Sequence, residues 1–175
     1  MKVTLEGYRK DKYYPSVVRA VARLLAESDE ISPVAVLLEM GNLLPKHHDA
    51  WRRGRVPYLE RVFQGNLSKA NRILRIIGFH VHDLNMVPHQ HTYRQIGKKR
   101  LLRFSKSGIP KIEKAYSRHY RWNQSPEKKH QAVEQGLAMK RKKRRRPRPA
   151  PPAPPPPAEE EAPDQDALPP GAIPW

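Results

Sequence analysis

The segment ISPVAVLLEMGNLLPKHHDAW, residues 31–51, decides the fold that we expect for this chain. Ser32 is a suitable N-cap and Pro33 a suitable first helical residue, so a helix is predicted to begin here. Gly41 is placed to end this helix, because glycine readily adopts the left-handed conformation that closes helices. A second short helix follows and carries Trp51. Two crossed helices with glycine at the turn are typical of a helix–turn–helix, although any small helical bundle can share this pattern.

Apolar residues recur at helical spacing on both sides of this segment. The pattern predicts further helices over residues 16–27, 56–64 and 67–77, and from Pro110 onward. Residues 78–83 alternate in polarity, and we expect them to be either extended or the end of a helix.

A β-hairpin is predicted after these helices. Thr92–Ile96 and Arg100–Ser105 are the two expected strands, joined through Gly97-Lys98-Lys99. Helices followed by a two-stranded ribbon with a basic tip are the arrangement of a winged helix, whose wing contacts a nucleic-acid backbone. A solvent-exposed hairpin whose lysines prevent edge pairing would give the same sequence.

The expected fold is therefore mostly α with a small β-hairpin, a helix–turn–helix or winged-helix-like domain followed by a disordered C-terminal tail. We expect an N-terminal extension over residues 1–14, the domain over residues 15–122 and the tail over residues 123–175. The tail holds a basic run (140–148), a proline-rich segment (147–157) and an acidic segment (159–166). Such a composition buries too little apolar surface to offset the entropy of ordering the chain.

Basic residues dominate the charge of the chain. Among 175 residues, 34 Lys and Arg face 17 Asp and Glu, a formal net charge of +17. Such a surplus is typical of proteins that bind a polyanion. Nucleic acid is the first candidate, an anionic membrane surface the second and an acidic protein the third. The 8 basic and 5 acidic residues from position 140 onward contribute only +3, so +14 lies before them.

Several kinds of site and segment are excluded by composition. The absence of Cys excludes disulfides, thiolate metal sites and cysteine nucleophiles. No apolar run approaches the roughly 20 residues of a membrane span, and the N-terminus lacks the apolar stretch of a signal peptide.

The sequence predicts a non-enzymatic nucleic-acid-binding protein without a cofactor, with DNA favoured over RNA. Arg, Lys and Asn can hydrogen-bond base edges, and Arg and Lys also neutralise phosphates. Phosphate contacts are expected from Arg52, Arg53, Arg55, Lys98, Lys99 and Arg100, and base contacts from Lys69, Asn71 and Arg72. The wider predicted set adds Lys46, Arg75, Lys140, Arg141, Lys142, Lys143, Arg144, Arg145 and Arg146.

Two alternative functions remain open. His80 and His82 alternate, as do His89 and His91, so on strands each pair would share a face and the four could hold Zn²⁺ or Mn²⁺. A metal-bound water would then support a hydrolase acting on nucleic acid. The spacing matches no established metal motif, and paired histidines are also common on surfaces and in cores. The other alternative is an adaptor whose proline-rich tail binds a protein partner. The oligomeric state is not set by any sequence feature.

Three segments resemble a group of small bacterial proteins of unassigned function. They are WRRGRVPYLERV (51–62), GNLSKANRILR (65–75) and LLRFSKSGIPKIEKAYSRHY (101–120), and the resemblance covers roughly residues 15–120. It carries no activity and assigns no site residue. It implies a bacterial, cytoplasmic protein, which would be nucleoid-associated if it binds DNA.

Overall fold

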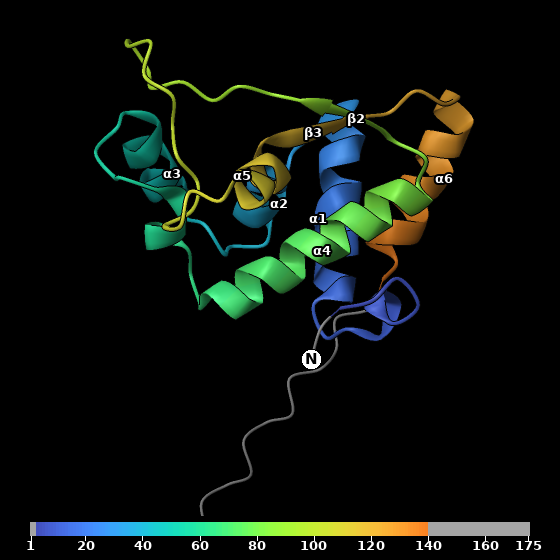
Figure 1. Ribbon diagram of the computed structural model, residues 1–175. Helices are drawn as coiled ribbons and strands as arrows, with labels where there is room; N and C mark the ends of the chain where they lie inside the picture. Colours follow the sequence, from blue (N-terminus) through green and yellow to red (C-terminus); the bar gives the residue numbers. More distant parts are fainter. Residues whose placement is uncertain (1–2, 140–175) are drawn as a thin grey trace, which may run out of the picture. The chain divides into compact units, whose positions relative to one another are not determined.

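Helix α1 (Tyr14–Glu27) lies at the centre of the structure, with α4 crossing it on one side and α6 packed along it on another (Figure 1). The computed structural model describes residues 3–139. The remaining α-helices of this part are α2 (Pro33–Glu39), α3 (Pro45–Arg52), α4 (Leu67–Asp83), α5 (Pro110–Ser117) and α6 (Pro126–Leu137). The strands are β1 (Glu30–Ile31), β2 (Val87–Gln90) and β3 (Arg118–Arg121), and the 3₁₀ helices are η1 (Tyr8–Lys10) and η2 (Leu59–Val62).

Local capping determines where these helices begin and end. Ser32 caps α2, because its hydroxyl accepts a hydrogen bond from the backbone N–H of Ala35. Proline occupies the first turn of α2, α3 and α5, as the sequence predicts. Gly41 follows α2 with φ of +72°, a conformation that strains other residues. The mostly helical prediction is therefore confirmed.

The core is built from apolar side chains on all of the helices around α1. Trp51 of α3 is fully buried, and its indole N–H donates to the carbonyl of Arg103 at 2.8 Å. Its ring lies 5.1 Å from the ring of Phe104, which stacks in turn on Tyr116 of α5. This line of aromatic rings joins α3, the 103–104 segment and α5 into one core.

The sheet is small and antiparallel, and its strand order is β1–β3–β2. Its register pairs Glu30 with Arg121 and His89 with His119. Paired residues point to the same face of a sheet and alternate residues share a face. These four side chains therefore lie on one face, which we call the histidine face.

The predicted strands of the hairpin at 92–105 are not formed as regular strands. Within the described part of the chain this segment holds one isolated β-bridge, between Arg94 and Leu101. Beyond this bridge the chain turns, since the N–H of Lys98 donates to the carbonyl of Gln95, and the N–H of Ile96 donates outward to the carbonyl of Arg52 in α3. The segment is a loop closed by a bridge, and the winged-helix arrangement is not confirmed.

Two predicted elements have a different structure from the one expected. The helix expected over residues 56–64 is reduced to η2, because the N–H groups of Leu59 and Glu60 donate to the carbonyls of Arg103 and Phe104. Of the two neighbouring helices expected over residues 56–64 and 67–77, only the second is therefore an α-helix, within α4. Residues 78–83, by contrast, continue α4 to Asp83.

The described part of the chain extends beyond the expected domain boundaries at both ends. Tyr8 is buried against Tyr14 and Phe79, so part of the expected N-terminal extension belongs to the core. Residues 126–137, expected in the tail, form α6 on α1, where Val133 and Gly136 are buried. The basic, proline-rich and acidic segments of the predicted tail lie outside the described residues.

Candidate functional site

The loop at 92–103 is anchored on the C-terminal end of α3. The backbone N–H of Ile96 donates to the carbonyl of Arg52 at 2.9 Å, and the side-chain amide of Gln95 donates to the carbonyl of Arg53 at 2.9 Å. Gly54 has φ of +73°, and a Cβ there would lie 2.5 Å from the Gln95 side chain. Glycine at this position therefore permits both the turn after α3 and the close approach of the loop.

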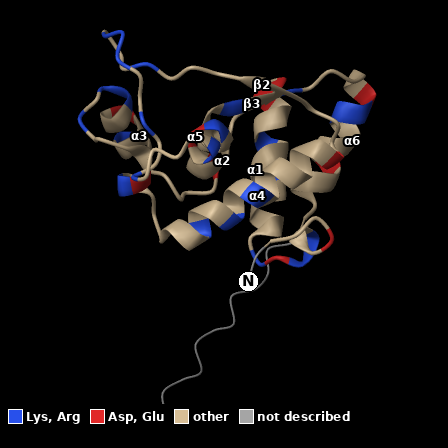
Figure 2. Cartoon of the chain, viewed as in Figure 1, with Lys and Arg blue, Asp and Glu red and all other residues tan. Residues whose placement is uncertain are grey.

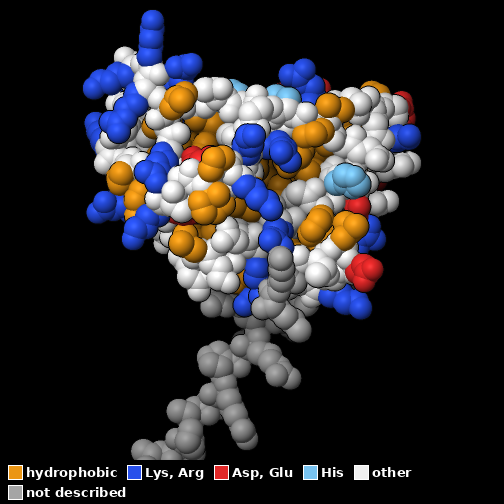
Figure 3. Space-filling model, viewed as in Figure 1, with side chains coloured by type: hydrophobic (Ala, Val, Ile, Leu, Met, Phe, Trp, Pro, Cys, Tyr) orange, Lys and Arg blue, Asp and Glu red, His pale blue; other side chains and the backbone are white. Residues whose placement is uncertain are grey.

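This anchoring brings together two groups of basic residues that are far apart in the sequence. The result is a surface that we call the loop–α3 cluster. Its members are Arg52, Arg53, Arg55, Arg94, Lys98, Lys99 and Arg100. Figure 2 shows the blue loop tip beside α3, and Figure 3 shows Lys and Arg side chains gathering on that side of the molecule, at the upper left.

Most cations of the loop–α3 cluster have no acidic partner. Arg53 pairs with Asp49 at 2.8 Å, and both side chains are exposed. Arg94 donates to the carbonyl of Lys99, and Arg52 lies over the ring of Tyr93. Within residues 3–139, no carboxylate forms an ion pair with the remaining members or with Arg52 and Arg94. The cluster therefore presents a concentrated positive charge to solvent.

Two of the three residues predicted to read bases, all on α4, are engaged within the protein. Arg72 forms an ion pair with Asp11, whose side chain is only 4% exposed. Lys69 donates to the carbonyl of Gln64 and lies close to the rings of Tyr13 and Phe63. Asn71 remains exposed. The arrangement thus gives less support to base contacts from α4 than to phosphate contacts from the loop–α3 cluster.

The other predicted cations are dispersed. Lys46 is exposed on α3. Arg75 lines a cavity of about 750 Å³ together with Lys111, Arg118 and apolar side chains such as Phe79. The predicted contacts from 140–146 lie outside the described residues.

The four histidines proposed from sequence do not form one group. His80 and His82 lie on α4, where residues two apart point to different sides of the helix. His80 is buried against Tyr14, whereas His82 is exposed and lines the cavity. The structure therefore does not gather His80, His82, His89 and His91 into one set of metal ligands.

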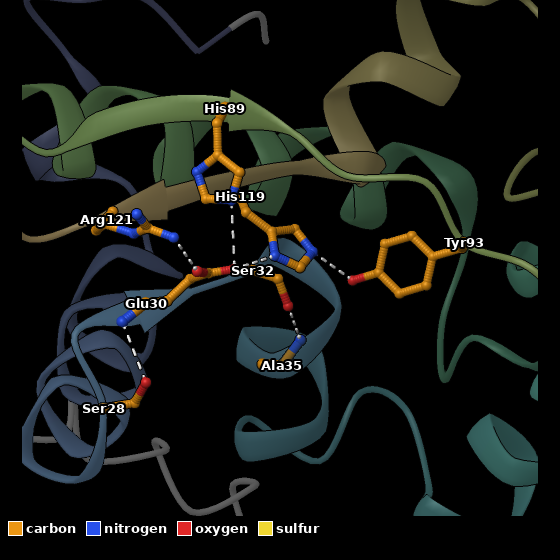
Figure 4. A network of polar contacts seen from close by, with 8 residues as sticks. All are labelled: Ser28, Glu30, Ser32, Ala35, His89, Tyr93, His119 and Arg121. Atoms are coloured by element: carbon orange, nitrogen blue, oxygen red, sulfur yellow. Dashed lines mark hydrogen bonds and ion pairs between the residues drawn. The ribbon is translucent and has the colours of Figure 1, made fainter.

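The structure instead brings His89 to His119 on the histidine face (Figure 4). The ring of His91 stacks on that of His119, with ring centroids 4.3 Å apart. Nδ1 of His119 lies 2.7 Å from Oε1 of Glu30, and Nε2 of His89 lies 3.4 Å from the same oxygen. On its other side, Nε2 of His119 is hydrogen-bonded to the hydroxyl of Tyr93 at 2.7 Å. His119 is thus held between a carboxylate and a phenol.

Electrostatics in this group favour a charged carboxylate and neutral imidazole. The hydrogen bond from His119, together with the nearby His89, holds the pKa of Glu30 below its usual value. Burial lowers the pKa of His119, and this effect outweighs the opposing attraction of Glu30. A neutral imidazole has a free lone pair for a metal ion or a proton donor.

Glu30 and His119 were not identified from the sequence. Both belong to strands that the sequence did not predict, and β1 has only two residues. One usable signal was the spacing of His119 and Arg121. Like His89 and His91, they are two residues apart and would share one face of a strand. Only the register of β2 with β3 pairs these segments.

No helix of residues 3–139 combines the length and apolar character that crossing a bilayer requires. Comparisons with protein-family models, with curated proteins and with solved structures each find no match to this chain. The function is therefore argued from the two surfaces described above.

Proposed function

We propose that this protein binds nucleic acid without catalysing a reaction on it, with duplex DNA favoured over RNA, through phosphate contacts made by the loop–α3 cluster. The observation that carries the proposal is the anchoring of Ile96 and Gln95 on α3, which gathers seven cations. Among residues 3–139 their one acidic partner is Asp49, which pairs with Arg53. Phosphate neutralisation by such cations releases counterions and supplies sequence-independent affinity.

The charge of the whole described part supports the same function. Residues 3–139 contain 25 Lys and Arg and 12 Asp and Glu, a formal net charge of +13. A positive field of this size steers a polyanion towards the protein and speeds association. The loop–α3 cluster would then form the contact itself, with Lys98, Lys99 and Arg100 at the exposed tip.

The test is a titration of labelled duplex DNA with the full chain, followed by fluorescence anisotropy across a range of salt. Binding is expected at about 50 mM salt, with affinity falling steeply as salt rises. In the triple variant Lys98→Gln, Lys99→Gln, Arg100→Gln, the slope of log affinity against log salt should fall by about 2.7 if each residue contacts one phosphate. Weaker competition by duplex RNA would support the preference for DNA.

A charge-matched variant separates a specific surface from a general effect of charge. Lys10→Gln, Lys12→Gln, Lys128→Gln also removes three exposed cations, none of them in the loop–α3 cluster. It should keep most of the native slope. Equal losses in the two triple variants would exclude this surface as the interface, and no binding of the native chain at about 50 mM salt would exclude the function.

A further inference from the structure

The histidine face places three metal-binding side chains from three strands next to one another. Glu30 lies on β1, His89 on β2 and His119 on β3, and the register of the sheet points all three to the same side. One ligand atom of each lies within 4.8 Å of the other two. None of the three side chains is deeply buried, so an ion can reach them from solvent.

The spacing of these atoms suits a zinc ion. Zinc binds nitrogen and oxygen ligands at about 2.1 Å in a tetrahedron, which sets the ligand atoms roughly 3.4 Å apart. Oε1 of Glu30 already lies 3.4 Å from Nε2 of His89 and 2.7 Å from Nδ1 of His119. The second pair must open to reach this spacing, and a ring nitrogen of each histidine lies within 4.8 Å of the other. We propose that Glu30, His89 and His119 form a Zn²⁺-binding site on the histidine face.

Neighbouring side chains orient these ligands in the way that metal sites require. A ligating histidine usually donates its other ring N–H to an oxygen acceptor, which fixes its tautomer. Tyr93 provides that oxygen for His119, since its hydroxyl lies 2.7 Å from Nε2. When zinc takes the lone pair of Nδ1, the neutral imidazole changes tautomer: the Nδ1 proton leaves to solvent, Nε2 takes up a proton from solvent, and Nε2–H donates to the hydroxyl oxygen of Tyr93. Arg121 contacts the other oxygen of Glu30, at 3.4 Å, so Oε1 remains available to the ion.

The chemistry of the donor set favours a transition metal such as zinc over Mg²⁺ and Ca²⁺. Two imidazoles and one carboxylate suit Zn²⁺, whereas Mg²⁺ and Ca²⁺ prefer oxygen ligands alone. Three protein ligands leave the fourth position of a tetrahedral ion open to water. This site is independent of the loop–α3 cluster, so either proposal can fail without the other.

Calorimetric titration of the full, chelator-treated chain with Zn²⁺ tests the site. The native chain should bind one ion, while His89→Ala and Glu30→Gln should each weaken that binding at least about tenfold. His89 is a half-exposed residue, so its replacement should leave the fold intact, and Glu30→Gln keeps the size of the side chain. Zinc should also raise the melting temperature of the native chain, because it binds the folded state and ties three strands together.

The matched control is His130→Ala, which removes another histidine that lies beside a carboxylate. His130 contacts Glu134 at 3.1 Å on the exposed surface of α6, so it represents incidental surface binding. This variant should bind zinc as the native chain does. Cobalt in place of zinc should give the intense visible absorption of a four-coordinate ion, lost in His89→Ala. Undiminished zinc binding in both His89→Ala and Glu30→Gln, or a native chain that binds no ion, would overturn the proposal.

Discussion

Arg72 donates from Nε and Nη2 to the same oxygen of Asp11, at 3.0 and 2.6 Å. Asp11 is almost fully buried, whereas the Arg72 side chain is 30% exposed. The sequence presented Arg72 as a basic residue opposite the apolar stripe of a helix, and therefore as a contact to DNA bases. Its guanidinium instead compensates a buried carboxylate that lies 61 positions away.

Arg72→Ala should lower the free energy of unfolding by about 2 to 4 kcal/mol, because it leaves the buried Asp11 carboxylate without a cation, with only the backbone N–H of Tyr13 as a hydrogen-bond donor. Arg53→Ala is the control, since it also breaks an Arg–Asp pair but an exposed one. Its effect should stay within about 0.5 kcal/mol. Urea unfolding followed by tryptophan fluorescence measures both values. Equal effects of the two substitutions would contradict the structural role given to Arg72.

His80 provides a second prediction at the scale of single residues. Burial lowers the pKa of this imidazole from 6.5 to about 4, an effect that the nearby Asp83 opposes and Arg9 reinforces. The ring of Tyr14 on α1 packs edge to face with the His80 imidazole, with ring centroids 5.9 Å apart. In the unfolded chain His80 takes up a proton as the pH falls through 6.5, whereas the folded protein resists until about pH 4.

Stability should therefore fall over this window of pH, and His80 should account for about 2 kcal/mol of the loss between pH 7 and pH 4.5. His80→Gln removes the titrating group, so its free energy of unfolding should fall less over the same window. Urea unfolding at the two pH values measures the difference. His130→Gln, an exposed position, is the control. Parallel pH profiles for His80→Gln and the native chain would contradict the prediction.

At the scale of elements, the sequence of α6 favours a helix only weakly, and the helix is stabilised by close packing on α1. A Cβ added to Gly136 would lie 2.5 Å from Cβ of Ala22 and 3.2 Å from the carbonyl oxygen of Val18, both on α1. The absence of a side chain at Gly136 therefore permits the two helices to approach this closely. Composition alone placed this segment in the tail, because it contains few apolar residues.

Gly136→Ala should destabilise the protein by about 1 to 3 kcal/mol, since the clash with α1 exceeds the gain of about 1 kcal/mol that alanine brings to a helix. Gly78→Ala in α4 is the matched control, because a Cβ there meets nothing within 4 Å. It should leave stability unchanged or raise it by up to about 1 kcal/mol. Thermal unfolding compares the two, and hydrogen exchange should show faster exchange in α6 of Gly136→Ala. A neutral Gly136→Ala would show that α6 is not held closely on α1.

The structure of the loop at 92–103 was predicted only in part from the sequence. Its two arms do meet, since the N–H of Gln95 donates to the carbonyl of Arg100 and that of Leu102 to Tyr93. Both a basic tip and a glycine turn follow directly from the sequence. The hydrogen bond from the N–H of Ile96 to the carbonyl of Arg52 does not follow from the sequence, because it depends on where α3 ends in space.

At the scale of the whole molecule, the surplus of positive charge belongs to the described residues as well as to the tail. Their formal net charge of +13 is spread over many elements, and several cations are used in internal ion pairs. The loop–α3 cluster differs because its cations converge while Asp49 is their one acidic partner among residues 3–139. The proposal therefore takes the class of partner from the composition and the contact surface from the fold.

The sequence by itself determined the helical class, the starts of α2, α3 and α5, and the basic character of the chain. The helix starts depend on short-range effects, namely the cap at Ser32 and the prolines of the first turns. The basic character follows from the count of charged residues. Only the tertiary structure decided which distant residues meet. Glu30 and His119 are 89 positions apart, and Arg52 receives its hydrogen bond from Ile96. Such contacts depend on strand register and core packing, which no local pattern of residues encodes.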